Sequence, residues 1–237
     1  IWLLTEGKRA FVVDPGDAAP VVARLLADGL SLEGILITHH HADHQGGVAD
    51  LVARWPARVY APATESITGC THPLSGGERI EVLGQSVRVI AVPGHTRGHL
   101  AYYTEGALFC GDTLFGAGCG RLFEGTPEQM STSLDSIAAL PDATLVYCAH
   151  EYTEMNLRFA LAVEPDNQAL QVRVAQVVEL RAAGLASVPS TLADEKATNP
   201  FLRCTVPAVI DAALRQGAMN PEKTAVFAAI RGWRNNF

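Results

Sequence analysis

The sequence predicts an α+β protein in which a strand-rich domain precedes a smaller, all-helical domain. Short apolar runs bounded by turn residues continue as far as Cys148, a pattern typical of strands. From residue 152 onward, apolar residues recur with the period of a helix, as at Leu170, Val174, Val177 and Val178. We therefore expect a first domain over residues 1–151 and a second over residues 152–237.

Composition limits the class of protein. The chain has 237 residues, of which 48% are hydrophobic and 18% charged, enough to bury a large core. We find neither a membrane-spanning stretch nor a signal peptide, and five cysteines without CxxC spacing indicate reduced thiols. The net charge of −7, with no basic block, argues against nucleic acid as a partner. We expect a cytoplasmic monomer that acts on a small molecule and not on a membrane.

The elements of the first domain follow from turns and apolar runs. Ile1–Thr5 and Ala10–Val13 flank Glu6-Gly7-Lys8, which predicts a β-hairpin, and a helical pattern begins at Ala18. Thr126, Pro127 and Gln129 have the spacing of a helix start with a capping box. Further strands are expected at residues 34–37, 58–60, 79–83, 86–92, 100–104, 107–110 and 144–148.

The second domain is expected to contain only helices and their connections. Gly184 stands where a helix C-cap belongs, and Asn199-Pro200 begins a non-helical stretch that ends at Arg203. Two more helical segments are expected near residues 207–216 and 221–234.

Four potential metal ligands lie within six residues, directly after the predicted strand at 34–37: His39, His41, Asp43 and His44. Imidazole and carboxylate suit borderline divalent metals. Residues two apart in an extended segment point the same way, so His39 and His41 can hold one ion. Asp43 and His44 lie past the bend, which suggests a second ion. A polar loop of exposed histidines is the alternative, and the density of ligands argues against it.

Three more candidates, His95, Asp112 and His150, each follow a predicted strand. Seven ligands suit two ions if Asp112 bridges them, with His39, His41 and His95 on one ion and Asp43, His44 and His150 on the other. Each ion would keep room for a shared water, as a catalytic site requires. We expect packing or hydrogen-bonding roles for the remaining histidines and leave open whether Asp14 orients a ligand or is an ordinary turn aspartate. Those histidines are His40, His72 and His99, and His72 is expected in a loop.

These ligands resemble the motifs of the metallo-β-lactamase superfamily, and three longer stretches narrow the resemblance to the glyoxalase II (hydroxyacylglutathione hydrolase) family, in particular its bacterial branch. They are residues 111–115 with 118–125, Ala149-His-Glu-Tyr-Thr153 and Asn199-Pro-Phe-Leu-Arg203. The resemblance implies an αβ/βα sandwich followed by a small helical C-terminal domain. It also implies hydrolysis of a glutathione thioester, S-D-lactoylglutathione, to D-lactate and glutathione in methylglyoxal detoxification.

The resemblance further implies that glutathione is held by Arg121, Phe123, Tyr152 and Arg203. Two departures from the family pattern matter. Some members have tyrosine where Phe123 stands, and some have a lysine shortly after Arg203, where this chain reads Cys204-Thr-Val-Pro207. One anchor for a glutathione carboxylate is therefore in question. Surface solvation is the alternative role for both arginines.

The expected mechanism is attack of a metal-bridging hydroxide on the thioester carbonyl, with Asp43 and Asp112 as the catalytic carboxylates. Metal-bound water ionises near neutral pH, and a thiolate leaves readily, so no general acid is needed. The cofactor would be two divalent ions, zinc being expected and iron or manganese also suiting these ligands. The alternatives are a glutathione persulfide dioxygenase with one iron and a metal-binding module without catalysis.

Overall fold

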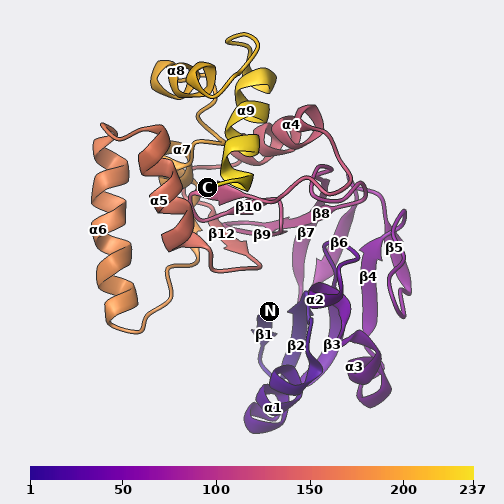
Figure 1. The fold of residues 1–237 in the computed structure, drawn as a ribbon. Helices are drawn as coiled ribbons and strands as arrows, with labels where there is room; N and C mark the ends of the chain where they lie inside the picture. The colour runs from indigo at the N-terminus through magenta and orange to yellow at the C-terminus, as the bar shows by residue number, and fades with distance from the viewer. The chain divides into compact units, whose positions relative to one another are not determined.

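The computed structural model of the protein describes residues 1–237 (Figure 1). The chain forms two compact units. The first consists of residues 1–91 and 96–111, and the second of residues 92–95 and 112–237. None of the helices combines the length and the apolar character needed to cross a bilayer.

The N-terminal sheet of the first unit has five strands in the order β1-β2-β3-β4-β5. β1 and β2 form the predicted antiparallel hairpin, and each later neighbour pairs in parallel. The strands are β1 (Trp2–Glu6), β2 (Arg9–Val13), β3 (Ser31–Leu36), β4 (Arg58–Pro62) and β5 (His72–Leu74). The expectation that His72 lies in a loop is wrong, because this residue begins β5 and its ring lies 4.6 Å from the Tyr60 ring.

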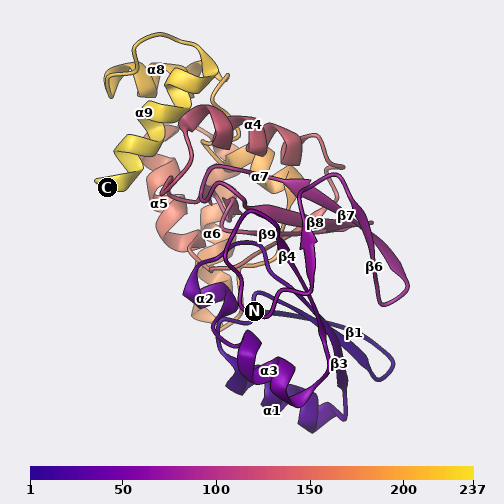
Figure 2. The same ribbon diagram turned by 90° about the vertical axis from the view of Figure 1, so that its right-hand side faces the viewer.

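The helices of this unit are α1 (Ala18–Asp28), the single turn α2 (Ala42–Gln45) and α3 (Val48–Arg54). The parallel strands advance in one direction across the sheet, so right-handed crossovers place α1 and α3 on the same face (Figure 2). Their apolar sides bury Val21, Leu25 and Leu51 against Val12 and Ile35 of the sheet. This core fixes the end of β3, from which the histidine-rich segment (residues 38–47) continues.

The first unit also contains an antiparallel meander. Its strands are β6 (Arg79–Val82), β7 (Gln85–Ala91), β8 (Leu100–Thr104) and β9 (Ala107–Gly111). The meander joins the N-terminal sheet where the buried Tyr102 hydroxyl donates to the Ile37 carbonyl over 2.7 Å. The Leu100 amide donates to Thr38 at the same edge, 2.9 Å away. The end of the meander is thereby bonded to the start of the histidine-rich segment.

The second unit is mainly helical, with one short hairpin and one further pair of short antiparallel strands. Its strands are β10 (Leu114–Phe115), β11 (Gly118–Cys119), β12 (Leu145–Cys148) and β13 (Ser190–Thr191), paired as β10–β11 and β12–β13. Its helices are α4 (Pro127–Ala138), α5 (Thr153–Val163), α6 (Gln168–Ala182), α7 (Leu192–Thr198), α8 (Pro207–Arg215) and α9 (Lys223–Asn235). Figure 1 shows α5 and α6 lying side by side.

The helical predictions for this unit hold with two differences. The capping box of Thr126 and Gln129 is present at α4, and Gly184 has the left-handed φ of +72° just after α6. Val178 is 55% exposed, so it is not on the buried face with Leu170 and Val177. The strand β13 was not expected, because a two-residue strand has no hydrophobic period to read.

Candidate metal centre

Four of the predicted ligands gather within the first unit. The chain stays extended through His41 and then makes the single turn of α2, so the imidazoles of His39, His41 and His44 converge. His39 Nε2 lies 3.0 Å from His41 Nδ1, and the rings of His39 and His44 are 4.0 Å apart. Asp43 Oδ2 lies 3.6 Å from His44 Nε2. His39 and His44 are buried, whereas Asp43 is exposed.

Asp14 orients two of these ligands. Its Oδ2 accepts from His44 Nδ1 (2.9 Å) and from the Thr38 hydroxyl (2.7 Å), and that hydroxyl oxygen lies 3.0 Å from His39 Nδ1. The proton of each imidazole is therefore on Nδ1, and each Nε2 lone pair is left to face the cluster. The structure thus decides between the two roles that the sequence left open for Asp14.

The turn after β2 is held tightly against the histidine-rich segment. Asp14 itself has a φ of +50°, which is uncommon for a residue other than glycine. A Cβ on Gly16 would lie 1.9 Å from the carbonyl oxygen of Asp43, and one on Gly47 would lie 2.5 Å from the Ala18 nitrogen. Only glycine allows these close approaches. The ligand loop is therefore fixed by backbone packing as well as by Asp14.

Sequence reasoning missed the role of Glu65. Its carboxylate accepts from the His40 amide (2.7 Å), the Thr96 hydroxyl (2.5 Å) and the Gly98 amide (2.9 Å). It therefore ties the histidine-rich segment to the loop that follows β7, within the first unit. The fully buried His99 stacks on His39 with the rings 4.6 Å apart, which agrees with its expected packing role. No local signal marks Glu65, because its partners come from distant parts of the chain.

The other three predicted ligands gather within the second unit. Asp112 Oδ2 lies 3.5 Å from His95 Nε2, and Asp112 Oδ1 lies 3.5 Å from His150 Nε2. His95 Nδ1 donates to the Arg121 carbonyl over 2.8 Å, which fixes the proton on Nδ1 and directs Nε2 toward Asp112. The two oxygens of one carboxylate therefore face two different imidazoles.

The spacing of these donors fits divalent metal ions. Two donors of a tetrahedral zinc ion, each 2.0–2.2 Å from it, lie roughly 3.3–3.6 Å apart. Three contacts match this spacing: His95 with Asp112, His150 with Asp112, and Asp43 with His44. They are too long for good hydrogen bonds. Asp43 and His44 also belong to one group of potential metal ligands whose ligand atoms are within 4.8 Å of one another.

The Cys148 thiol, two residues before His150, is buried, and its Sγ donates to the His150 carbonyl over 3.5 Å. Burial raises the pKa of Cys148 to about 12, so this side chain stays a neutral thiol at physiological pH. All five cysteines are free, as expected from their spacing, and four of them are buried.

Two of the predicted substrate-binding residues are exposed aromatics that lie on ligand rings. The Phe123 side chain is 63% exposed, and its ring meets the His95 ring edge-on at 5.3 Å. The Tyr152 side chain is 42% exposed and stacks on His150 at 5.2 Å. Exposed aromatic residues in contact with predicted ligands offer a surface on which a substrate can pack.

The two predicted arginines have different surroundings. Arg121 is exposed, two residues before Phe123. Arg203 donates from Nε (2.7 Å) and Nη2 (3.0 Å) to the carboxylate of Glu164, which is 4% exposed, and from Nη1 to the Lys196 carbonyl (3.2 Å). A guanidinium has five N–H donors, so two of those on Arg203 remain for a ligand.

Comparison with known proteins assigns both parts of the chain. Residues 1–150 match the metallo-beta-lactamase superfamily, and residues 151–237 match the hydroxyacylglutathione hydrolase C-terminus. The chain is 74% identical to the hydroxyacylglutathione hydrolase of Dechloromonas aromatica, with 100% of this chain and 95% of the relative covered. It belongs to the hydroxyacylglutathione hydrolase family. A second member, from Methylobacillus flagellatus, is 56% identical over 100% of this chain and 94% of its own length.

Solved structures show the same fold. ETHE1 from Myxococcus xanthus is 22% identical, with a TM-score of 0.66, and the comparison covers 98% of this chain and 91% of that one. The B3 metallo-beta-lactamase BLEG-1 is 24% identical with a TM-score of 0.63, covering 84% and 92%. TTHA1623, solved in a di-iron-bound form, is 30% identical with a TM-score of 0.53, covering 63% and 85%.

These comparisons confirm the predicted α+β class, the metallo-β-lactamase fold and the helical C-terminal region. The family consists of hydrolases that cleave a glutathione thioester, and this chain, as a member, is a thioester hydrolase. The comparisons do not favour the persulfide dioxygenase. The histidine and aspartate groups, together with the superfamily, indicate binding of divalent metal.

Proposed function

We propose that this chain hydrolyses S-(2-hydroxyacyl)glutathione, with S-D-lactoylglutathione as the type substrate, to the 2-hydroxy acid and glutathione. In this role it would complete the detoxification of methylglyoxal. The proposed centre contains two divalent ions held by His39, His41, Asp43, His44, His95, Asp112 and His150. Zinc is the proposed metal, and the di-iron form of TTHA1623 makes iron a second choice to be tested.

The geometry of Asp112 carries the proposal of two ions. One carboxylate oxygen faces His95 and the other faces His150, each at 3.5 Å. A carboxylate that shared a single ion with both histidines would not need to direct its two oxygens to different partners. We therefore assign His95 to one ion, His150 to the other and Asp112 to both.

Chain continuity supports the union of the seven ligands in one centre. The chain passes between the two units directly after His95 and directly before Asp112. The neighbours of His95 and Asp112 across these junctions are Thr96 and Gly111, which belong to the first unit. Both are linked there to the histidine-rich segment. Thr96 bonds to Glu65, which also holds the His40 amide, and a Cβ on Gly111 would lie 2.4 Å from the Thr38 hydroxyl. Asp112 is thus one peptide bond from a residue beside the segment, and His95 is one peptide bond from a residue bonded to its partner Glu65.

When bound, the metals would lower the pKa of water toward 7 and polarise the thioester carbonyl. Asp14 and the Arg121 carbonyl fix the Nδ1 sides of His39, His44 and His95, so the Nε2 lone pairs of these residues would hold the ions. Asp43 and Asp112 supply the negative charge that two cations need. The leaving thiol has an ordinary pKa near 8.5, so the site requires no residue as a general acid, and none is assigned.

The proposed substrate-binding residues are Arg121, Phe123, Tyr152 and Arg203. The aromatic rings lie against two metal ligands, so glutathione packed on them would bring its acyl group to the centre. The arginines would bind its carboxylates, which a chain of net charge −7 would otherwise repel. The exposed Arg121 and the two remaining donors of Arg203 support this assignment.

We further propose that residues 1–151 form the catalytic domain and that residues 152–237 serve in substrate binding. The boundary is supported by the division of the family matches at residue 150. We also propose that the protein works as a cytoplasmic monomer. Its five free cysteines, four of them buried, suit a reducing compartment.

The test is hydrolysis of S-lactoylglutathione by protein whose metal content has been measured. We expect about two metal ions per chain and turnover that is lost on chelation and restored by added zinc, iron or manganese. One iron per chain with oxygen consumption would instead support the persulfide dioxygenase. Full metal loading with no thioester hydrolysis would support the binding module.

A further inference from the structure

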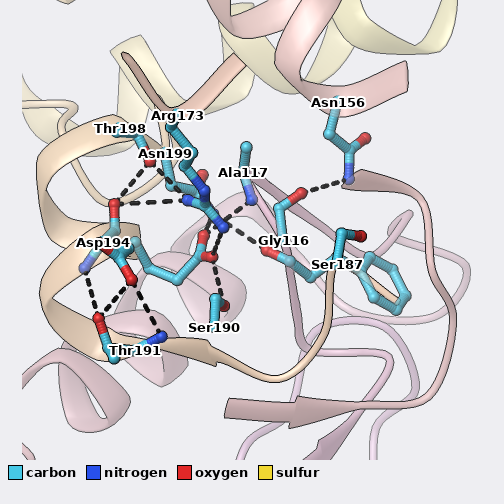
Figure 3. Close-up of polar contacts among 12 residues, drawn as sticks. Gly116, Ala117, Asn156, Arg173, Ser187, Ser190, Thr191, Asp194, Thr198 and Asn199 are labelled. Carbon is cyan, nitrogen blue, oxygen red and sulfur yellow. Dashed lines mark hydrogen bonds and ion pairs between the residues drawn. The ribbon is translucent and has the colours of Figure 1, made fainter. Parts of the chain in front are cut away.

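The hairpin of β10 and β11 is held at its tip by side chains from the C-terminal region. The Gly116 carbonyl accepts from Asn156 Nδ2 at 3.0 Å, and the Gly118 carbonyl accepts from Asn199 Nδ2 at 2.9 Å. The Ala117 amide donates to Glu195 Oε2 at 2.8 Å. Figure 3 shows Asn156 and Asn199 directed at this turn. Three consecutive residues are therefore fixed by α5, α7 and the residue after α7.

The turn needs this support because Ala117 has a φ of +54°. A residue in the left-handed region at the third position of a four-residue turn is typical of a type II turn, where glycine is usual. Alanine carries a steric cost there, and such a conformation persists only where its surroundings impose it. The bond to Glu195 acts directly on the strained residue.

Glu195 is the centre of the supporting network. It is fully buried, and Oε1 accepts from Arg173 of α6 and from the Ser190 hydroxyl at 2.7 Å, while Oε2 also accepts from Asn199 at 3.0 Å. Figure 3 shows these partners around the turn. Four donors satisfy this buried carboxylate, so its position is closely determined. The network fixes the turn to α6, α7 and β13 at once.

The hairpin leads directly to the groups that orient His95. Arg121, two residues after β11, accepts the His95 Nδ1 proton, and the Phe123 amide donates to the His95 carbonyl at 3.2 Å. A Cβ on Gly120 would lie 1.9 Å from the Asp112 carbonyl oxygen and 3.1 Å from His95 Nδ1. Because Gly120 is packed this closely, we expect a shift of the hairpin to move the Arg121 carbonyl, which is the hydrogen-bond partner of His95.

We propose that Glu195 is a positioning residue, which, with Asn156 and Asn199, sets the turn at residues 116–118 and thereby the orientation of His95 and of the substrate-binding Arg121 and Phe123. The inference rests on the proposed function, because it takes His95 as a metal ligand. It gives the C-terminal helices a second task beyond substrate contact, namely to shape the metal site.

The experiment compares Glu195→Gln with Asp194→Asn in the full chain. Asp194 is the neighbouring residue of α7 and completes the capping box with Thr191, so its variant weakens the same helix without touching the turn. Zinc affinity is measured by titrating apoprotein against a chelator, and KM and kcat are measured for S-lactoylglutathione. We expect Glu195→Gln to weaken zinc binding roughly 10-fold, the low end for loss of a direct partner of a metal-bound histidine because Glu195 acts through the turn, and to raise KM. Asp194→Asn should change only the unfolding midpoint.

A second substitution tests the turn itself. Ala117→Gly removes the steric cost of the left-handed conformation, so it should restore much of the zinc affinity and KM in the Glu195→Gln background. In the wild-type background it should change neither. Amide exchange at residue 117 should be faster in Glu195→Gln than in Asp194→Asn.

Zinc affinity and KM that stay at wild-type values in Glu195→Gln would overturn the proposal, as would equal losses in Asp194→Asn. If Glu195→Gln does not fold, Asn156→Ala serves in its place. It removes the hydrogen bond to Gly116 and leaves the ion pair between Arg173 and Glu195 intact. Failure of the proposed function is distinct, because wild-type protein would then bind no pair of metals or hydrolyse no thioester.

Discussion

Asp14 shows how much a single residue outside the ligand set decides. Its carboxylate fixes the ring protons of both His39 and His44, although it lies more than twenty positions before them in the chain. The residue adopts a positive φ to reach them. Glu65 likewise organises several groups with one side chain, because its carboxylate accepts hydrogen bonds from two backbone amides and one hydroxyl. At this scale the site is a set of ligands whose orientation is set by their neighbours.

The role of Asp112 can be tested by removing its carboxylate. We expect Asp112→Ala to lose both metal ions and at least 1,000-fold in turnover, since one side chain would be withdrawn from both ions (~4 kcal/mol). Metal per chain by elemental analysis, alongside thioester hydrolysis, provides the measurement. Near-normal turnover, or loss of only one ion, would contradict the bridging role.

Arg203 combines a structural role with the proposed binding role, and the two can be separated. Arg203→Ala would leave the buried Glu164 unpaired, at a cost of about 3 kcal/mol in the free energy of unfolding, the low end for a buried pair because Arg203 is 21% exposed. We expect it also to raise KM for the glutathione thioester more than it lowers kcat.

The double variant Arg203→Ala/Glu164→Gln is the control. It should recover most of the stability, because no buried charge is stranded, while KM stays high. Recovery of KM together with stability would show that Arg203 acts only through the fold.

At the scale of elements, the site depends on where strands end. His39 follows β3, His95 follows β7, Asp112 follows β9 and His150 follows β12. Side chains just past strand ends are held by a rigid sheet while the backbone is free to turn. The helices contribute differently: through buried side chains such as Glu195 they hold the short hairpin that reaches His95.

The capping box of α4 offers a test of element stability. Thr126→Ala should lower the free energy of unfolding by about 1 kcal/mol, because it removes the acceptor for the Gln129 amide. Denaturation in urea measures the change. Ser136→Ala, on the exposed part of the same helix, is the matched control and should be neutral or slightly stabilising. A Thr126→Ala variant as stable as this control would contradict the capping role.

At the scale of the whole molecule, two compact units each contain part of the proposed ligand set, and the chain passes between the units beside His95 and Asp112. Family comparisons divide the same chain at residue 150. The functional division and the compact units therefore do not coincide. We expect metal binding by the proposed ligand set to require the folding of both units.

The free energy of unfolding at alkaline pH depends on the buried thiol of Cys204. Burial raises the pKa of Cys204 from near 9 to about 12. Above pH 9 the unfolded chain loses this proton while the folded protein keeps it. Stability is therefore unaffected below pH 9 and falls by about 1.4 kcal/mol per pH unit from this thiol as the pH rises toward 12. Urea denaturation of wild type and Cys204→Ala between pH 8 and 11 should show a difference that narrows with pH; a constant difference would contradict this assignment.

The sequence alone predicted the ligand types, most strands and helices, the capping box and the family, because these depend on local pattern and on motifs of fixed spacing. It could not show that Asp14 orients ligands, that Val178 faces solvent or that His72 begins a strand, since each of these depends on what packs against the residue. It also gave no sign that Arg203 pairs with Glu164, 39 positions away.

Amino-acid order therefore determined which side chains could bind metal and which chemistry they could support, since donor type and spacing along the chain are properties of the covalent sequence. Only the tertiary structure decided which ring nitrogen of His39, His44 and His95 forms a hydrogen bond to a neighbour, and that the left-handed Ala117 is bonded to Glu195. Those outcomes arise from hydrogen bonds between residues remote in sequence, which form only after the backbone has packed.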